Sequence, residues 1–133
     1  MTAANDRLET GRAIRAEVLG AEYVDQSLAR ATDFSRPLQE LVTEYCWGTV
    51  WARPGLDRTT RSLLNIAMLA ALGHQSEVTL HAAGAMRNGC TVDQIQEVLL
   101  QVAIYCGVPA ALNASRSAQA GIESVSSDRP EDD

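Results

Sequence analysis

The spacing of apolar side chains along the chain predicts a protein built from helices. Apolar residues recur three or four positions apart, which places them on one face of an α-helix, and no stretch alternates apolar and polar residues for long enough to indicate a strand. We therefore expect an all-α fold, a compact bundle of six or seven helices. The expected helices cover approximately residues 5–19, 21–31, 35–51, 57–73, 75–87, 91–105 and 109–124.

The segment between Asp57 and Gly73 is apolar on almost every side. Asp57 is a suitable N-cap for this helix, and Gly73 a suitable stop. A helix that is apolar all round is typically buried, so we expect this one to be the central helix of the bundle. Its apolar positions are Leu63, Leu64, Ile66, Ala67, Met68, Leu69, Ala70, Ala71 and Leu72.

The sixth helix carries a specific start signal. Thr91 and Gln94 have the spacing of a capping box, in which each side chain accepts a hydrogen bond from the other residue's backbone N–H. This pattern predicts a helix that begins at Thr91. The residues expected to face inward from it are Ile95, Val98, Leu99, Val102, Tyr105 and Cys106.

Length and composition indicate one domain with an alanine-rich interior. Hydrophobic residues make up 46% of the 133 residues and aromatic residues only 5%, so small aliphatic side chains must fill the core. We assign residues 1–124 to a single helical domain. Residues 125–133 include four carboxylates and are expected to form an acidic, disordered tail.

Charge and patterning exclude several classes of function. A net charge of -6 does not supply the basic face that a general nucleic-acid binder needs, and no apolar run approaches the ~18 residues of a membrane span. The first residues lack the pattern of a signal peptide, so we expect a cytoplasmic protein. Cys46, Cys90 and Cys106 are far apart and are expected to be buried, reduced thiols.

The cations of this chain are eleven arginines, without a single lysine. This excludes Schiff-base catalysis by a lysine side chain, a pyridoxal-phosphate lysine and the lysine of a phosphate-binding loop. A codon-usage bias toward arginine explains this composition most simply, and the chemical exclusion holds in either case.

Arg58 and Arg61 lie three positions apart in the first turn of the helix after Asp57, and Arg53 shortly precedes it. Cations at this end oppose the helix dipole, so helix stability alone does not favour them. Together with the backbone N–H groups of the helix start they suit a substrate carboxylate. Structural ion pairs with acidic neighbours or a second subunit explain the same residues equally well.

Glu77 and His81 lie four positions apart on the fifth helix, so the carboxylate can orient the imidazole. Such a pair suits general acid–base catalysis, because histidine titrates near neutral pH. A core-facing histidine that bonds to its helix neighbour is the alternative. His74, Glu77 and His81 could also be drawn as a metal site, but no further ligands stand at a telling spacing, and we expect no metal.

Trp47 and Trp51 are four positions apart and are expected to stack along one helix face, next to the break at Pro54. Aromatic pairs of this kind occur more often in a core or a subunit interface than in a pocket wall. Glu97 and Gln101 form a polar strip on the sixth helix, which is typical of a solvated face.

Several stretches together resemble the γ-carboxymuconolactone decarboxylases, within the broader alkylhydroperoxidase D-like superfamily. They follow one another in order over nearly the whole chain, to about residue 122. The stretches are Gly11-x-x-x-Arg15-x-x-Val18-Leu19-Gly20, then Trp47-Gly48-x-x-Trp51-x-Arg53-Pro54-Gly55-Leu56-x-Arg58-x-x-Arg61-Ser62-Leu63, then Leu80-His81, and Glu97-Val98-Leu99-Leu100 followed by Ile104-Tyr105-Cys106-Gly107-x-Pro109-Ala110-Ala111.

The resemblance implies an all-helical subunit of a homo-oligomer, commonly a hexamer, that needs no cofactor. The implied activity is loss of CO2 from 4-carboxymuconolactone, giving 3-oxoadipate enol-lactone in the protocatechuate branch (the β-ketoadipate pathway) of aromatic catabolism. Redox members of the superfamily carry a C-x-x-C-x-x-x-H motif where this chain has His74-x-x-Glu77-x-x-x-His81. The missing thiol pair disfavours dithiol peroxidase chemistry.

With that substrate supposed, the candidate residues acquire roles. Arg58 and Arg61, with Arg53, are expected to hold the dianionic substrate. His81 is expected to donate the proton or stabilise the oxyanion, with Glu77 orienting it. Trp47 and Trp51 are expected to form a dry wall beside the leaving carboxylate.

Two alternatives to this function stay open. One is a related decarboxylase or lactone-processing enzyme that acts on another unsaturated lactone. The other is a non-catalytic helical oligomer that binds a small molecule.

Overall fold

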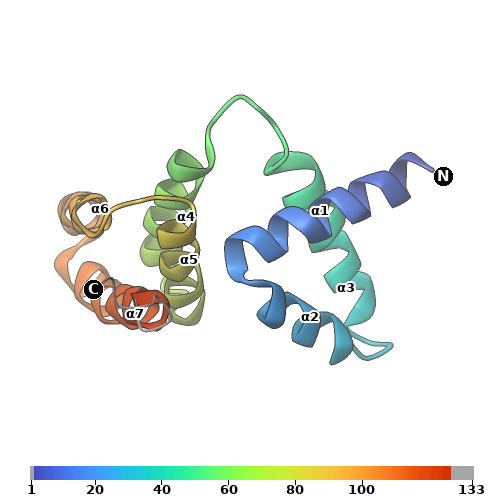
Figure 1. The fold of residues 1–133 in the computed structure, drawn as a ribbon. Helices are drawn as coiled ribbons and strands as arrows, with labels where there is room; N and C mark the ends of the chain where they lie inside the picture. Colours follow the sequence, from blue (N-terminus) through green and yellow to red (C-terminus); the bar gives the residue numbers. More distant parts are fainter. Residues whose placement is uncertain (1, 127–133) are drawn as a thin grey trace, which may run out of the picture. The chain divides into compact units, whose positions relative to one another are not determined.

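The computed structural model describes residues 2–126, which form helices joined by turns, without a strand among them (Figure 1). The predicted all-α fold is confirmed. Along the chain the helices are α1 (Ala3–Leu19), α2 (Ala21–Ala29), α3 (Arg36–Leu41), the π-helix η1 (Val42–Val50), α4 (Arg58–Leu72), α5 (Gln75–Arg87), α6 (Val92–Cys106) and α7 (Val108–Ser126).

Local signals set the ends of these helices. The chain leaves α1 at Gly20 and α6 at Gly107 with backbone φ angles of 96° and 104°, which residues with a side chain rarely adopt. The predicted capping box is confirmed at the start of α6. Thr91 Oγ1 accepts from the Gln94 N–H at 3.1 Å, and Gln94 Oε1 accepts from the Thr91 N–H at 3.0 Å.

The third predicted helix changes its winding after Leu41. From Val42 to Val50 it is a π-helix, and at its end the Trp51 N–H donates to the Cys46 carbonyl, five residues back, at 3.0 Å. Apolar spacing did not predict this change, because the periods of α- and π-helices differ by less than one residue per turn. The π-helix is rare, and most examples are single turns within α-helices, frequently at functional sites.

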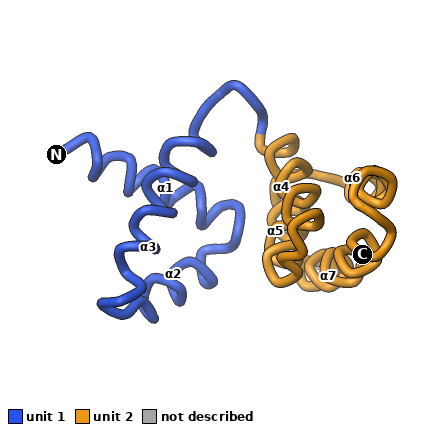
Figure 2. The backbone as a smooth tube through the Cα atoms, turned by 180° about the vertical axis from the view of Figure 1, so that it is seen from behind, with its two compact units in different colours: residues 1–57 blue, residues 58–133 orange. Residues whose placement is uncertain are grey.

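The described residues fall into two compact units, residues 2–57 (unit 1) and residues 58–126 (unit 2) (Figure 2). The boundary lies just after the Pro54-Gly55 break that the sequence indicates. The single domain predicted for residues 1–124 stays a prediction. α7 continues two residues past the predicted end of that domain, and the rest of the predicted tail, residues 127–133, lies outside the described residues.

Unit 1 is organised by the close packing of α1 against η1. A Cβ atom on Gly11 would clash with the Thr43 carbonyl oxygen and lie 2.7 Å from the Gly48 nitrogen. A Cβ atom on Gly48 would clash with the Arg7 carbonyl oxygen. The two glycines therefore allow the backbones of α1 and η1 to approach more closely than side chains would permit.

Replacement of Gly11 by alanine should destabilise the protein by about 1–3 kcal/mol, because the new methyl group meets backbone atoms that cannot rotate away. Urea denaturation followed by circular dichroism measures this change. Gly55→Ala is the matched control, since a Cβ atom there has open space and the residue has no positive φ angle. Equal stabilities of the two variants would contradict the packing argument.

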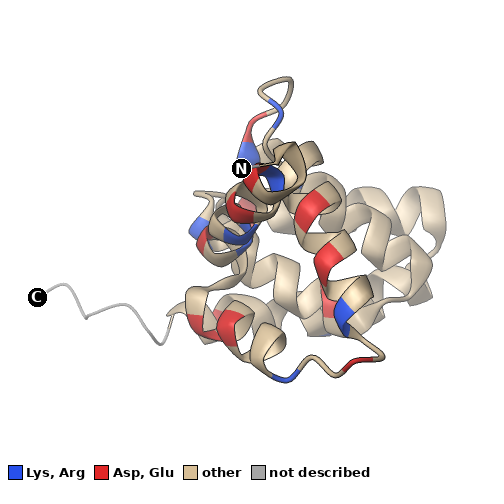
Figure 3. Cartoon of the chain, turned by 90° about the vertical axis from the view of Figure 1, so that its right-hand side faces the viewer, with Lys and Arg blue, Asp and Glu red and all other residues tan. Residues whose placement is uncertain are grey.

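Charged side chains of unit 1 form several ion pairs. Blue and red residues are interspersed along the helices in Figure 3, rather than separated into faces of one sign. Arg12–Asp25 and Arg36–Asp33 are exposed pairs, which contribute little stability each, whereas Arg7–Glu44 is half-buried. The pairs are Arg7–Glu44 at 2.9 Å, Arg12–Asp25 at 3.2 Å and Arg36–Asp33 at 2.9 Å.

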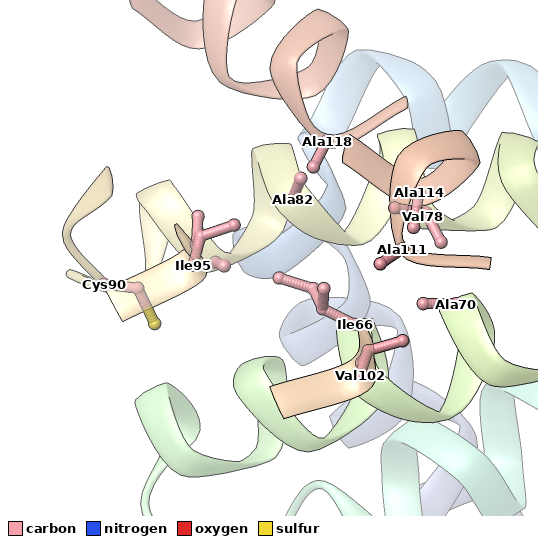
Figure 4. Packing of buried hydrophobic residues seen from close by; sticks show 11 residues of the cluster. Ile66, Ala70, Val78, Ala82, Cys90, Ile95, Val102, Ala111, Ala114 and Ala118 are labelled. Carbon is pink, nitrogen blue, oxygen red and sulfur yellow. The ribbon is translucent and has the colours of Figure 1, made fainter. Parts of the chain in front are cut away.

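In unit 2, α5 packs against α4 and α7, and α6 also packs against α4 and α7. Side chains from these four helices meet around Ile66 in the close view of the core (Figure 4). Most of the buried partners are alanine or valine, as the composition predicts. Gly121 lets α7 approach α5, because a Cβ atom there would clash with the Thr79 carbonyl oxygen.

The prediction that the fourth helix is buried all round is wrong for the chain as described. α4 buries one stripe, formed by Ser62, Ile66 and Ala70 at intervals of four residues. Its helical neighbours within unit 2 cover that stripe and leave another side open. The exposed residues on the open side are Leu64 (46%), Met68 (54%) and Leu72 (70%).

Three further burial predictions, for Tyr105, Cys106 and Cys46, are wrong in the described chain. Tyr105 is 80% exposed, because it lies at the edge of the stripe defined by Ile95 and Val102. Cys106 is exposed because it is the last residue of α6. Among the cysteines only Cys90 is buried. Cys46 is exposed as a whole residue, but partial burial of its thiol raises the pKa of that group, and the charge of Arg15 opposes this shift.

A search of the described residues finds no helix that is both long enough and apolar enough to cross a membrane.

Candidate functional site

The predicted site residues come from both units. Arg58, Arg61, Glu77 and His81 belong to unit 2, and Trp47, Trp51 and Arg53 belong to unit 1.

The helices α4 and α5 form a hairpin that brings polar side chains together. The turn between them passes through Gly73, whose φ angle is +77°. Asn88, just after α5, donates from Nδ2 to Ser62 Oγ of α4 at 2.8 Å. Further along the hairpin, Asn65 Nδ2 lies 3.5 Å from His81 Nδ1. The pairing of two helices thus places His81 beside an amide that is distant in sequence.

His81 is buried within the chain, with 8% of its surface exposed. Burial lowers its pKa from 6.5 to about 4, because the charged imidazolium is poorly solvated there. The ring is therefore neutral near pH 7. A neutral imidazole has one N–H donor and one acceptor nitrogen, so it can stabilise an oxyanion by hydrogen bonding without carrying a charge itself.

Glu77 and His74 are exposed at the start of α5. Glu77 precedes His81 by four residues, as the predicted orienting pair requires, and its role stays a prediction. His74 occupies the N-cap position of the helix. No cluster of three or more histidine, cysteine, aspartate or glutamate side chains suited to a metal ion occurs within residues 2–126.

Arg58 and Arg61 lie in the first turn of α4, as predicted, and both are half-buried. The Nε atom of Arg61 is buried, so this side chain lies against the protein rather than extending into solvent. Arg61 and Asn65 are four residues apart and share a face of α4. Because Asn65 reaches His81, one side of the hairpin carries a cation, an amide and a neutral imidazole in succession.

In unit 1, Trp47 and Trp51 stack with ring centroids 4.7 Å apart and an interplanar angle of 24°. Both are buried, so the predicted stacking is confirmed, while their role as a wall of the site stays a prediction. Arg53 is exposed in the turn that follows, where its N–H donates to the Val50 carbonyl at 3.1 Å.

Arg15 of the first motif is buried and has a structural explanation. Its Nη1 donates to Gln39 Oε1 at 3.0 Å and to Thr43 Oγ1 at 3.2 Å. Gly11, one turn earlier, allows the same contact between α1 and η1. The Gly11-x-x-x-Arg15 pattern therefore joins these two helices.

A groove of about 520 Å³ lies between α4 and α6. Its lining is largely apolar, with Asp93, Glu97 and Gln101 contributed by α6. Glu97 and Gln101 are exposed, as the sequence predicts. None of Arg58, Arg61 and His81 lines this groove, so we do not place the chemistry there.

Asn65 is the candidate functional residue that the sequence interpretation missed. It is the one amide within the apolar run from Leu63 to Leu72. Asparagine is a poor helix former and is costly to bury in an apolar helix. This single amide in an otherwise apolar run was the signal in the sequence that could have identified Asn65.

The buried, neutral state of His81 predicts a dependence of stability on acid. Because the folded pKa, about 4, lies below the unfolded value of 6.5, the unfolded state binds the proton more tightly between these values. The contribution of neutral His81 to stability should be fully present above pH 6.5. The free energy of unfolding should then fall by about 3 kcal/mol as the pH approaches 4. Urea denaturation of the wild type and of His81→Gln measures this loss, which the variant should lack and a His74→Gln control should retain.

Comparison with known proteins identifies the family to which this chain belongs. A sequence profile described as the Carboxymuconolactone decarboxylase family matches residues 36–120. The chain is 47% identical over 117 residues to a nitrosuccinic acid decarboxylase of Metarhizium robertsii, covering 84% of this chain and 82% of that protein. It is 41% identical over 113 residues to a 4-carboxymuconolactone decarboxylase of Acinetobacter baylyi, covering 85% and 84% respectively. The chain therefore belongs to the carboxymuconolactone decarboxylase family.

Proposed function

We propose that this protein is a carboxy-lyase that removes CO2 from 4-carboxymuconolactone without a cofactor and yields 3-oxoadipate enol-lactone, in the β-ketoadipate pathway of aromatic catabolism. The observation that carries the proposal is the 41% identity to a 4-carboxymuconolactone decarboxylase over 85% of this chain. Both relatives are decarboxylases, which supports the carboxy-lyase class.

The substrate itself provides the electron sink for this reaction. When the C–CO2 bond breaks, its electron pair delocalises through the ring double bond into the lactone carbonyl and forms an extended dienolate. A proton then adds to carbon and restores the lactone carbonyl, so that the product keeps the one remaining carboxylate. The protein must stabilise the developing oxyanion and hold a dianionic substrate, and a set of arginines with one buried imidazole suits both tasks.

In this proposal Arg58 and Arg61, with Arg53, bind the substrate carboxylates. Neutral His81 donates a hydrogen bond to the oxygen on which the dienolate charge develops. The low pKa of His81 favours this role over proton donation by an imidazolium. Glu77 is proposed to assist its orientation, and Trp47 and Trp51 to keep water from the leaving carboxylate.

Nitrosuccinic acid is a second candidate substrate, favoured by the 47% identity to a nitrosuccinic acid decarboxylase. This compound is also a dicarboxylic acid with an electron sink next to a carboxylate. Loss of that carboxylate places the electron pair on the nitro group as a nitronate, whose charge again lies on oxygen. The same arginines and the same imidazole N–H therefore suit either substrate.

Purified protein incubated with each substrate distinguishes these functions. Turnover of 4-carboxymuconolactone is followed through the loss of its ultraviolet absorbance, and turnover of nitrosuccinate through release of CO2. A higher kcat/KM for the lactone supports the proposal, and a higher value for nitrosuccinate supports the second candidate. Binding of either compound without turnover would instead indicate the non-catalytic alternative.

We further propose that the active form is a cytoplasmic homo-oligomer, with a hexamer as the expected state. The support is the exposed apolar surface of unit 2, where Leu72 on α4 is 70% exposed and Ile104 on α6 is 81% exposed. Exposed apolar patches frequently mark subunit interfaces.

Light scattering after size-exclusion chromatography should give a mass of about six times the 14.3 kDa subunit. Ile104→Glu should lower this mass, because a buried carboxylate at an interface is costly. Gln119→Glu, an exposed change on α7, should leave it unaltered. A wild-type mass of about one subunit at micromolar protein concentration would contradict the proposal that the protein is a homo-oligomer.

A further inference from the structure

Asn65 contacts the imidazole of His81 on a nitrogen whose protonation matters for the proposed reaction. The Asn65 Nδ2 atom lies 3.5 Å from His81 Nδ1. An amide nitrogen donates hydrogen bonds, so this contact favours the tautomer of His81 in which Nδ1 is the acceptor. A neutral imidazole carries one proton, which that tautomer holds on Nε2.

The position of Asn65 in α4 supports a role beyond helix formation. It lies among Leu63, Leu64 and Ile66, in a helix whose core-facing stripe is formed by Ile66 and its neighbours. An asparagine there lowers helix stability relative to leucine, and its partly buried amide needs a partner. The imidazole of His81, from another helix, is one such partner.

We propose that Asn65 is a positioning residue that holds His81 in the tautomer with the proton on Nε2, and so makes Nε2–H the donor to the oxyanion. This inference rests on the proposed decarboxylase function. It applies to a dienolate and a nitronate alike, because both place their charge on oxygen. Asn65 acts through His81 and is not itself assigned a contact with the substrate.

Nuclear magnetic resonance tests the tautomer without any substrate. In protein labelled with ¹⁵N-histidine, long-range ¹H–¹⁵N spectra distinguish a protonated from an unprotonated ring nitrogen. The chain has only two histidines, so a His74→Gln variant assigns the signals of His81. We expect wild-type His81 to be a single Nε2–H tautomer at pH 7. A wild-type signal from the Nδ1–H tautomer would overturn the inference.

Two substitutions test whether Asn65 determines the tautomer of His81. In Asn65→Asp the carboxylate can only accept a hydrogen bond from the ring, so the proton should move to Nδ1. Loss of the Nε2–H donor should then lower kcat about 10²–10³-fold, with a smaller change in KM. Asn65→Leu should give a mixture of tautomers and about a tenfold lower kcat, as expected for one lost hydrogen bond.

Comparison variants separate this role from others. Asn113→Leu, an exposed change on α7, should leave the tautomer and kcat unchanged. If Glu77→Gln alters the tautomer and the Asn65 variants do not, Glu77 is the orienting residue and the inference is wrong. If Asn65→Leu fails to fold, the wild-type spectrum and the Asn65→Asp variant still test whether Asn65 determines the tautomer of His81.

The outcomes also separate this inference from the proposed function. An Nε2–H tautomer that depends on Asn65, in a protein that turns over neither substrate, would overturn the proposed decarboxylation while the assignment of the proton stands. Turnover in a protein whose His81 carries its proton on Nδ1 would support the decarboxylase and overturn the role of Asn65.

Discussion

His81→Ala is expected to lower kcat on 4-carboxymuconolactone by about 10²–10⁴-fold, the range typical of a positioned acid–base group or an oxyanion donor. The variant removes the buried imidazole that we propose to stabilise the dienolate. Because the ring acts on the transition state more than on the bound substrate, KM should change much less than kcat. Initial rates of absorbance loss, measured over a range of substrate concentrations, give both parameters.

His74→Ala is the matched control for this experiment. His74 is the other histidine of the chain and is exposed at the N-cap of α5, without a proposed part in catalysis. Its rates should equal those of the wild type. Decarboxylation by His81→Ala at wild-type rates would remove His81 from the mechanism.

Arg61→Met should lower kcat/KM about ten- to a hundredfold, with most of the effect in KM. The variant removes a charge-assisted hydrogen bond to a substrate carboxylate, and such bonds contribute about 1.5–3 kcal/mol each. Methionine keeps the aliphatic bulk of this half-buried side chain, so the packing of α4 should change little. The same steady-state assay measures the effect, with the melting temperature checked in parallel.

Two further variants test whether geometry or charge alone matters at Arg61. Arg61→Lys keeps the charge but loses the planar fork that binds a carboxylate through two donors, so it should recover only part of the lost affinity. Arg116→Met removes an exposed cation from α7 and serves as the control for net charge. If Arg116→Met weakens substrate binding as much as Arg61→Met, the effect is general electrostatics and not a carboxylate clamp.

Most helix boundaries were predictable because they depend on neighbouring residues. The capping box of Thr91 and Gln94 forms from side chains three residues apart, and the stops at Gly20 and Gly107 need only a positive φ angle. The stacking of Trp47 on Trp51 follows from their spacing along one helix. The family was also visible in the sequence, since motifs preserved in order do not require knowledge of the fold.

Errors arose where burial depends on distant segments. The apolar pattern of α4 indicated burial on every side, but Leu72 is exposed because the helices of unit 2 that pack against α4 cover only part of its surface. The π-helical winding of η1 was likewise missed, since a period that is longer by less than one residue per turn leaves little trace in the spacing of apolar side chains.

The sequence by itself determined the helical fold, the family and the chemical types at the site: arginines without lysine, and a histidine without a thiol pair. Only the tertiary structure decided the environment of that histidine. The packing of α4 against α5 buries His81, lowers its pKa to about 4 and places Asn65 at its Nδ1. Such a contact joins residues sixteen positions apart on two helices, so no local pattern specifies it, whereas desolvation and hydrogen bonding depend directly on it.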